Sequence, residues 1–143
     1  MNRQIERLTS YPEMEARLRQ HLEETKGQQQ RLADILASHG TDSSSIKDTI
    51  QALMGNMAAL GHSAAGDEIL KNTFANYAFE SFEIAAYKSL IIMAEAVGDQ
   101  AALNALNQSL REELAMQEWL EAQIEPTTNK YIALEQTEGS GKI

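Results

Sequence analysis

Residues 67–98, DEILKNTFANYAFESFEIAAYKSLIIMAEAVG, form the longest uninterrupted helical pattern in this chain. Alternating steps of three and four residues keep one face of a helix towards its neighbours. On that face a single carboxylate lies among mostly apolar side chains: Leu70, Thr73, Tyr77, Glu80, Ile84, Tyr87, Ile91 and Ala94. Apolar residues also cover the adjoining faces, so we expect this helix to lie inside a helical bundle.

Two glutamates of this helix, Glu80 and Glu83, are therefore expected to point into the protein. A buried carboxylate costs free energy unless it is paired, hydrogen-bonded, protonated or bound to a metal ion. The E-x-x-E pattern on a central helix is the strongest indication of a functional site in the sequence. It does not name a substrate.

Length and composition limit the possible classes of protein. The 143 residues fit one domain with a single core, and only two prolines favour an all-α fold. A net charge of −9 disfavours nucleic acids and anionic membranes as partners. The absence of cysteine excludes disulfides, thiolate metal sites and thiol nucleophiles. Neither a leader nor a membrane-spanning run is present, which predicts a cytoplasmic protein.

The second helix is expected over residues 11–38, with Ser10 as N-cap and Gly40 ending it. Its buried face has apolar ends and a polar middle: Met14, Leu18, His21, Thr25, Gln28, Leu32 and Ile35. Glu24 lies beside this face, whereas Glu23 falls among wetter residues, so spacing favours Glu24 as the inward carboxylate. The favoured interpretation of His21 is a hydrogen-bonded or partly exposed histidine.

Two further helices are expected. Residues 44–60 place Ile46, Ile50, Leu53, Met54, Met57 and Leu60 on one side, and this helix is long enough to cross the bundle rather than close a tight hairpin. His62 follows it as a loop residue without a role. The last helix starts after the N-cap Asp99 and ends near Ile124, before Pro126.

The predicted inward face of the last helix also has a polar middle: Leu103, Leu106, Leu110, Glu113, Gln117, Leu120 and Ile124. Glu113 and Gln117 could instead lie at the edge of the face and reach solvent. Because three helices each place a carboxylate or amide in the middle of an apolar face, we expect a shared polar layer.

The two ends of the chain differ from this pattern. Met1, Ile5 and Leu8 share one helical face, but the run is short, which indicates the second half of a longer, truncated first helix or else a short lead-in helix. After Pro126 the period is lost. We expect a bundle domain over residues 1–126 and a tail over 127–143, whose Tyr131, Ile132 and Leu134 pack on the bundle or on a second subunit.

Four blocks of sequence carry a resemblance to a known family: HLEETKGQQQRL (21–32), KDTIQALMGNMAALGHS (47–63), FESFEIAAYKSL (79–90) and REELAMQEWL (111–120). They resemble the bacterial YciE/YciF stress proteins, a ferritin-like group of unknown function, with YciE the closer branch. The resemblance implies an all-α, ferritin-like four-helix bundle with a long helical crossover, a homodimer, and kinship with rubrerythrin-type proteins that hold two metal ions. Such sites use glutamates from all four helices and E-x-x-H on two.

Carried over by position, Glu80, Glu83 and Glu113 match carboxylate ligands of that pattern, and either Glu23 or Glu24 matches the glutamate of the second helix. The expected histidines are replaced: Met116 follows Glu113, and Lys26 or Gly27 follows the second-helix glutamate. The first-helix glutamate would lie in the missing half of that helix. We therefore expect Glu24, Glu80, Glu83 and Glu113 as metal ligands, supported by His21, Gln28, Tyr87 and Gln117.

This reduced ligand set suits iron or manganese, bound weakly or not at all. The resemblance implies a stress-associated protein, and the sequence offers no catalytic residues and no identifiable small-molecule substrate. A working di-iron or di-manganese protein that handles peroxide or oxygen is the alternative function. A plain helical interaction module with a structural acidic layer is the third.

Overall fold

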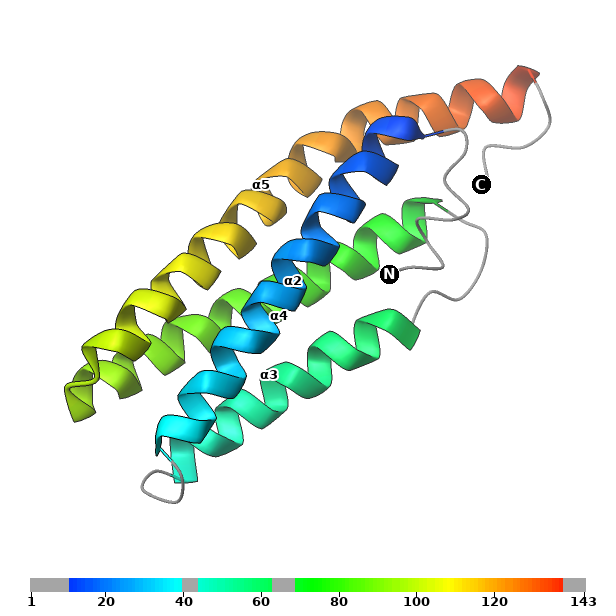
Figure 1. Cartoon of the computed structure of the whole chain (residues 1–143). Helices are drawn as coiled ribbons and strands as arrows, with labels where there is room; N and C mark the ends of the chain where they lie inside the picture. Colours follow the sequence, from blue (N-terminus) through cyan, green and yellow to red (C-terminus); the bar gives the residue numbers. More distant parts are fainter. Residues whose placement is uncertain (1–10, 40–43, 63–68, 138–143) are drawn as a thin grey trace.

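The computed structural model describes residues 11–39, 44–62 and 69–137. They form four helices: α2 (Pro12–His39), α3 (Ser44–His62), α4 (Ile69–Val97) and α5 (Gln100–Thr137). No strand occurs in these three ranges, and the predicted all-α four-helix bundle is confirmed (Figure 1). The helix expected over the first nine residues, Ser10 and Gly40 lie outside the described residues.

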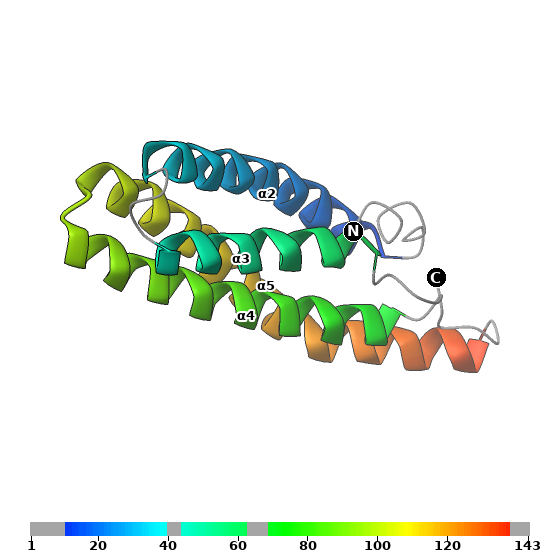
Figure 2. The ribbon, with the colours of Figure 1, turned by 90° about the horizontal axis from the view of Figure 1, so that it is seen from below.

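The four helices lie side by side, and each runs opposite to the one before it (Figures 1 and 2). Both α2 and α4 contact α3 and α5. Because α3 carries the chain back along the bundle, α2 and α4 run in the same direction, as the expected long crossover requires. In the described part of the chain α3 is itself the fourth helix of the bundle. His62, expected in a loop, is its last helical residue.

The buried face of α2 is the predicted one. All seven residues of the predicted face are buried: Met14, Leu18, His21, Thr25, Gln28, Leu32 and Ile35. The apolar residues fall at the two ends of this face. One end packs in a cluster with Ile50, Leu53 and Leu90, and the other in a cluster with Met116 and Leu120. A polar layer is left between the two apolar clusters.

The predicted end of α5 is wrong, since the helix continues through Pro126 to Thr137. A proline inside a helix removes one backbone hydrogen bond and crowds the carbonyl four residues earlier, at a cost of about 3 kcal/mol. Contacts beyond the proline offset this cost. Thr127 is buried, Tyr131 and Leu134 pack on the cluster around Leu120, and the Thr128 hydroxyl donates to the Ile124 carbonyl at 2.6 Å. Residues 127–137 of the expected tail are therefore helical.

The inward face of α5 is also rotated from the predicted one. Leu106, Glu113 and Leu120 are buried as expected, but the residues between them differ. Ser109 and Met116 are buried where Leu110 and Gln117 were expected, and Ile124 is 38% exposed. The observed face takes steps of three then four through the same three residues, where the predicted face took four then three. This turn brings Ser109 towards Arg31 of α2, which donates to its hydroxyl.

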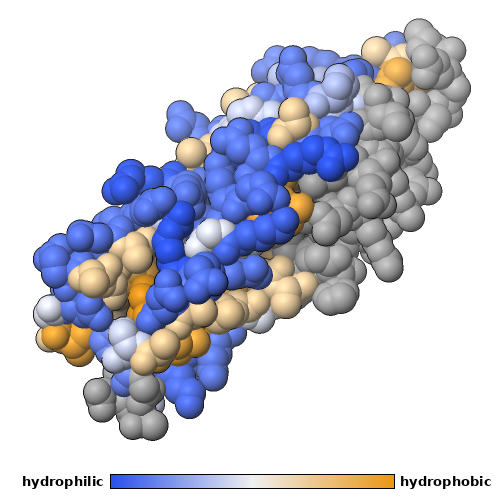
Figure 3. All heavy atoms as spheres, viewed as in Figure 1, coloured by the Kyte–Doolittle hydropathy of each residue, from blue (hydrophilic) through white to orange (hydrophobic). Residues whose placement is uncertain are grey.

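One face of α4 is open, contrary to the expectation that the bundle encloses this helix. Phe74 is 54% exposed, Phe82 47% and Ile92 67%. A shallow groove of about 380 Å³ between α3 and α4 is lined by Ala52, Phe82, Ala85 and Ser89, among others. On the face seen in Figure 3, hydrophilic residues cover α2 and more hydrophobic ones follow α3. In the described part of the chain, no helix is long and apolar enough to cross a membrane.

Candidate metal centre

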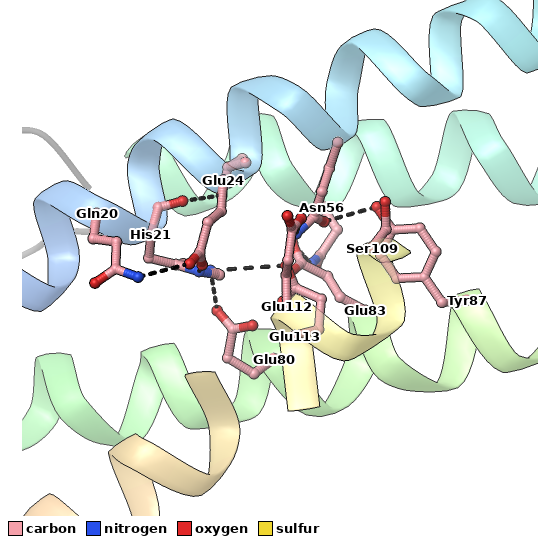
Figure 4. A network of polar contacts seen from close by, with 12 residues as sticks. Gln20, His21, Glu24, Asn56, Glu80, Glu83, Tyr87, Ser109, Glu112 and Glu113 are labelled. Carbon is pink, nitrogen blue, oxygen red and sulfur yellow. Dashed lines mark hydrogen bonds and ion pairs between the residues drawn. The ribbon is translucent and has the colours of Figure 1, made fainter. Parts of the chain in front are cut away.

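A histidine and three glutamates meet in the middle of the bundle. His21 comes from α2, Glu80 and Glu83 lie one turn apart on α4, and Glu113 comes from α5 (Figure 4). Each offers one ligand atom, and these four atoms lie within 4.8 Å of one another. All four side chains are at most 2% exposed. We call these four residues the central cluster.

Several polar atoms of the central cluster have no hydrogen-bond partner among the described residues: His21 Nε2, both carboxylate oxygens of Glu80, and Glu113 Oε2. His21 Nε2 lies 2.9 Å from Glu80 Oε1 and 3.8 Å from Glu113 Oε1. Buried polar atoms are rarely left without partners, and each costs about 1–3 kcal/mol. Buried oxygen and nitrogen atoms that converge in this way fit a bound cation, so these residues fit a metal ion.

Without a metal ion, protons must reduce the charge of the central cluster. Burial raises the pKa of Glu80 to about 8, and the neighbouring Glu113 contributes to this rise. Burial and Glu113 likewise raise the pKa of Glu83 to about 11. Burial alone would also raise the pKa of Glu113, but its contacts with Glu80, Glu83 and His21 outweigh burial and lower it. In the metal-free cluster burial therefore favours the protonated forms of Glu80 and Glu83, and their contacts with Glu113 favour its ionised form.

His21 balances that remaining negative charge. Burial would lower the pKa of its imidazole, but the hydrogen bond with Glu24 and the closeness of the Glu80 and Glu113 carboxyl groups prevail and raise the pKa to about 10. A metal ligand must be a deprotonated carboxylate or a neutral imidazole nitrogen, so a divalent ion would displace protons from Glu80, Glu83 and His21.

A chain of hydrogen bonds fixes Glu113 from the side of α2. Gln28 Nε2 donates to Glu113 Oε1 at 2.6 Å and to Glu112 Oε1 at 3.2 Å. The hydroxyl of Tyr87 donates to Gln28 Oε1 at 2.8 Å. Burial raises the pKa of Tyr87, so this hydroxyl keeps its proton and remains a donor. Gln28 and Tyr87 thus belong to the polar layer as predicted, and they orient one carboxylate of the central cluster.

The pair of Arg31 and Glu112 was not predicted from the sequence. Arg31 Nη1 donates to Glu112 Oε1 and to the Ser109 hydroxyl, both at 2.9 Å, and Nη2 donates to Glu112 Oε2 at 3.2 Å. This two-point contact holds Glu112 at the edge of the bundle, outside the central cluster. Arg31 lies three residues after Gln28 on the same helix, and this spacing could have indicated that Arg31 lies beside the polar layer.

The structure places the two candidate glutamates of α2 differently. Glu23 is 71% exposed and contacts Lys26 at 2.8 Å, whereas the Glu24 side chain is 18% exposed. The choice of Glu24 as the more inward carboxylate is confirmed. Its Oε2 lies 2.9 Å from His21 Nδ1, and it is not part of the central cluster. Its role as a ligand stays a prediction, and the structure places His21 where that ligand was expected.

The structure also shows where four other polar or candidate positions lie. His21 is fully buried and hydrogen-bonded, so the partly exposed alternative is wrong. Gln117 donates to the Ser81 hydroxyl at 2.6 Å near the surface and lies outside the polar layer. Asn56, not singled out in the sequence, reaches Glu83 Oε1 from α3 at 3.4 Å. Met116 is fully buried where the family pattern expects histidine, and it packs in the apolar cluster with Leu120.

An antiparallel helical bundle with buried carboxylates and one imidazole converging from three helices defines a class: an all-α protein with a candidate metal centre in its core. The family model described as a domain of unknown function (DUF892) matches residues 1–133, and the chain belongs to this family. The matched region includes all of α2, α3 and α4 and continues in α5 beyond Pro126.

Proposed function

We propose that this protein is a ferritin-like, stress-associated protein of the YciE/YciF type, which binds one divalent metal ion in its core and is not an enzyme. The observation that supports metal binding is the convergence of four buried ligand atoms within 4.8 Å, in a cluster where His21, Glu80 and Glu113 each have a polar atom without a hydrogen-bond partner. With metal–ligand bonds of about 2.1 Å, one ion bridges atoms about 4.2 Å apart, so small side-chain shifts complete the site.

Three carboxylates and one imidazole indicate which ions the site would bind. Oxygen-rich sites with a nitrogen ligand suit iron(II) or manganese(II). Two metal ions about 3.5–4 Å apart need more ligands than four residues that supply one ligand atom each. The nearest further carboxylates are already engaged, Glu112 by Arg31 and Glu24 by His21. This ligand count favours one ion over the di-iron or di-manganese alternative.

The absence of a catalytic role is supported by access. The central cluster is buried, and three hollows in the described part of the chain, of about 240, 380 and 350 Å³, are lined by other residues. A metal ion with four protein ligands in such a place has little room for a substrate.

The test is elemental analysis of tag-free protein purified without chelator, followed by titration with Fe(II) and with Mn(II) under nitrogen. Wild type and a matched Glu23→Gln control should bind about one ion per chain, and a Glu80→Gln, Glu113→Gln double variant should bind none. Two ions per chain would favour the di-metal alternative. No binding by wild type would leave a helical bundle whose acidic layer has no metal.

We also propose that the protein is a homodimer that covers the open face of α4. This proposal rests on the resemblance to YciE/YciF and on the exposed Phe74, Phe82 and Ile92. Sedimentation velocity of wild type and of a Phe82→Glu variant tests it: a dimer that dissociates in the variant supports it, and a monomeric wild type contradicts it.

A further inference from the structure

The two nitrogens of the His21 ring face different partners. Nδ1 lies 2.9 Å from Glu24 Oε2 on the same helix, and Nε2 lies 2.9 Å from Glu80 Oε1 on α4. The ring therefore lies between a partly exposed carboxylate and the central cluster (Figure 4). An imidazole binds a metal ion through one nitrogen while the other nitrogen carries a proton. The group that accepts a hydrogen bond from this proton determines which of the two nitrogens is left to bind the metal ion.

We propose that Glu24 is a positioning residue rather than a ligand: it accepts the Nδ1 proton of His21 and thereby directs Nε2 to the metal ion. This inference rests on the proposed function. It replaces the expected E-x-x-H of α2 with a motif of reversed order, His21-x-x-Glu24, in which the histidine binds and the glutamate orients it.

Glu24 is itself held in place by two neighbours. Gln20 Nε2 donates to Glu24 Oε1 at 3.1 Å, and Arg17 Nη1 lies 3.5 Å from Glu24 Oε2. One oxygen is engaged by Gln20 and the other by His21 and Arg17, so Glu24 contacts the central cluster through His21. Burial would raise the pKa of Glu24, but His21 and Arg17 lower it, which keeps the acceptor ionised.

The four residues of this arrangement lie on one helix. Arg17, Gln20, His21 and Glu24 follow one another at spacings of three, one and three residues, so they share a single face of α2. The partners of Nδ1 therefore all lie within α2, whereas Nε2 faces Glu80 of α4. Glu23, directly before Glu24, is exposed and pairs with Lys26, which makes it a matched control.

The first experiment measures Mn(II) binding by electron paramagnetic resonance for wild type, Glu24→Ala, Glu24→Gln and Glu23→Gln. Loss of an outer-shell partner typically weakens metal binding about 10- to 100-fold, which is the loss expected for Glu24→Ala. Glu24→Gln should lose less, because its amide oxygen can still accept the Nδ1 proton. Glu23→Gln should bind as wild type does, and thermal unfolding should show that all four proteins are folded.

The second experiment follows the ring protons in the metal-free protein by ¹⁵N-resolved NMR. The Nδ1 proton of His21 should be visible and slow to exchange in wild type and Glu23→Gln, and lost in Glu24→Ala. If Glu24→Ala does not fold, Glu24→Gln provides the comparison.

The two experiments separate the two proposals. Failure of wild type to bind Mn(II), with a visible Nδ1 proton, overturns the proposed function. If wild type binds Mn(II) but the Nδ1 proton is absent, only the positioning role is overturned. The same holds if wild type binds Mn(II) and Glu24→Ala binds it as tightly as Glu23→Gln does.

Discussion

The apolar cluster at one end of the bundle and the central cluster in its middle are equally buried but contribute to stability with opposite sign. Ile50, Leu53 and Leu90 are at most 1% exposed, and apolar contacts account for their burial. Glu80 is also fully buried, yet both of its oxygens lack hydrogen-bond partners among the described residues. The comparison shows that the ends hold the fold together and that the polar layer is a cost they offset.

The largest effect is expected at the apolar end. Leu53→Ala removes a fully buried side chain from a packed cluster and should lower the free energy of unfolding by about 2–5 kcal/mol, measured by urea denaturation. Ala52→Gly, an exposed helical neighbour, is the control and should cost about 1 kcal/mol. Equal losses in both variants would contradict the assigned core.

The opposite sign is expected in the middle of the bundle. In metal-free protein, Glu80→Met replaces an unpaired buried carboxyl with an apolar group of similar length and should raise the free energy of unfolding by about 1–4 kcal/mol. The same substitution should abolish metal binding. A metal-free variant less stable than wild type would mean that Glu80 contributes a favourable interaction not accounted for by its neighbours.

The pH dependence of stability sharpens the comparison further. The folded state keeps the Glu80 proton up to about pH 8, whereas the unfolded chain loses it near the ordinary value of 4.5. The resulting stability is complete below about pH 4.5 and is lost as the pH rises to 8. Glu83 adds a loss in the same direction between 4.5 and about 11, and His21 adds one between 6.5 and about 10.

Metal-free wild type should therefore lose a few kcal/mol of unfolding free energy between pH 5 and pH 8. Urea denaturation at several pH values measures this loss, and Glu80→Gln should reduce it. A profile that rises with pH over this range would show that Glu80 and His21 are not protonated in the folded state.

The smallest effect is expected at the start of α5. Asp99 Oδ1 accepts the backbone N–H of Ala102 at 3.0 Å, and Asp99 Oδ2 lies 2.6 Å from His39 Nε2. Asp99→Ala removes this N-cap and should cost about 1 kcal/mol by thermal or urea unfolding, whereas Asp99→Ser should retain part of the cap. An unchanged Asp99→Ala variant would show that the cap contributes nothing to stability.

The sequence predicted a buried face best where the residue types and the helical period indicate the same face. The buried face of α2 was predicted in full because apolar ends and small polar residues leave one choice of face, and Glu80 and Glu83 were correctly expected to be buried. The period of α5 was ambiguous, because steps of three and four through Leu106, Glu113 and Leu120 are compatible with two faces. Only packing against α2 decides between Met116 and Gln117.

The candidate site was predicted only in part for a different reason. Spacing shows which face a residue lies on, but not how a side chain bonds to its neighbours across the bundle. His21 was therefore treated as a supporting residue and Glu24 as a ligand, and the contact of Arg31 with Glu112, which joins residues distant in sequence, was not foreseen. The end of the last helix was predicted wrongly at Pro126 for the same reason, because contacts of Tyr131 and Leu134 offset the local cost of the proline.

The position of Pro126 inside α5 also divides that helix into parts of unequal local stability. After the missing backbone hydrogen bond, residues 127–137 are held to the bundle by a few side chains, chiefly Thr127, Tyr131 and Leu134. Such a segment can unfold locally while the rest of the bundle stays folded. Its amide hydrogens should accordingly exchange with solvent well before those of residues 103–120, so that the end of α5 is a separate cooperative unit of the fold.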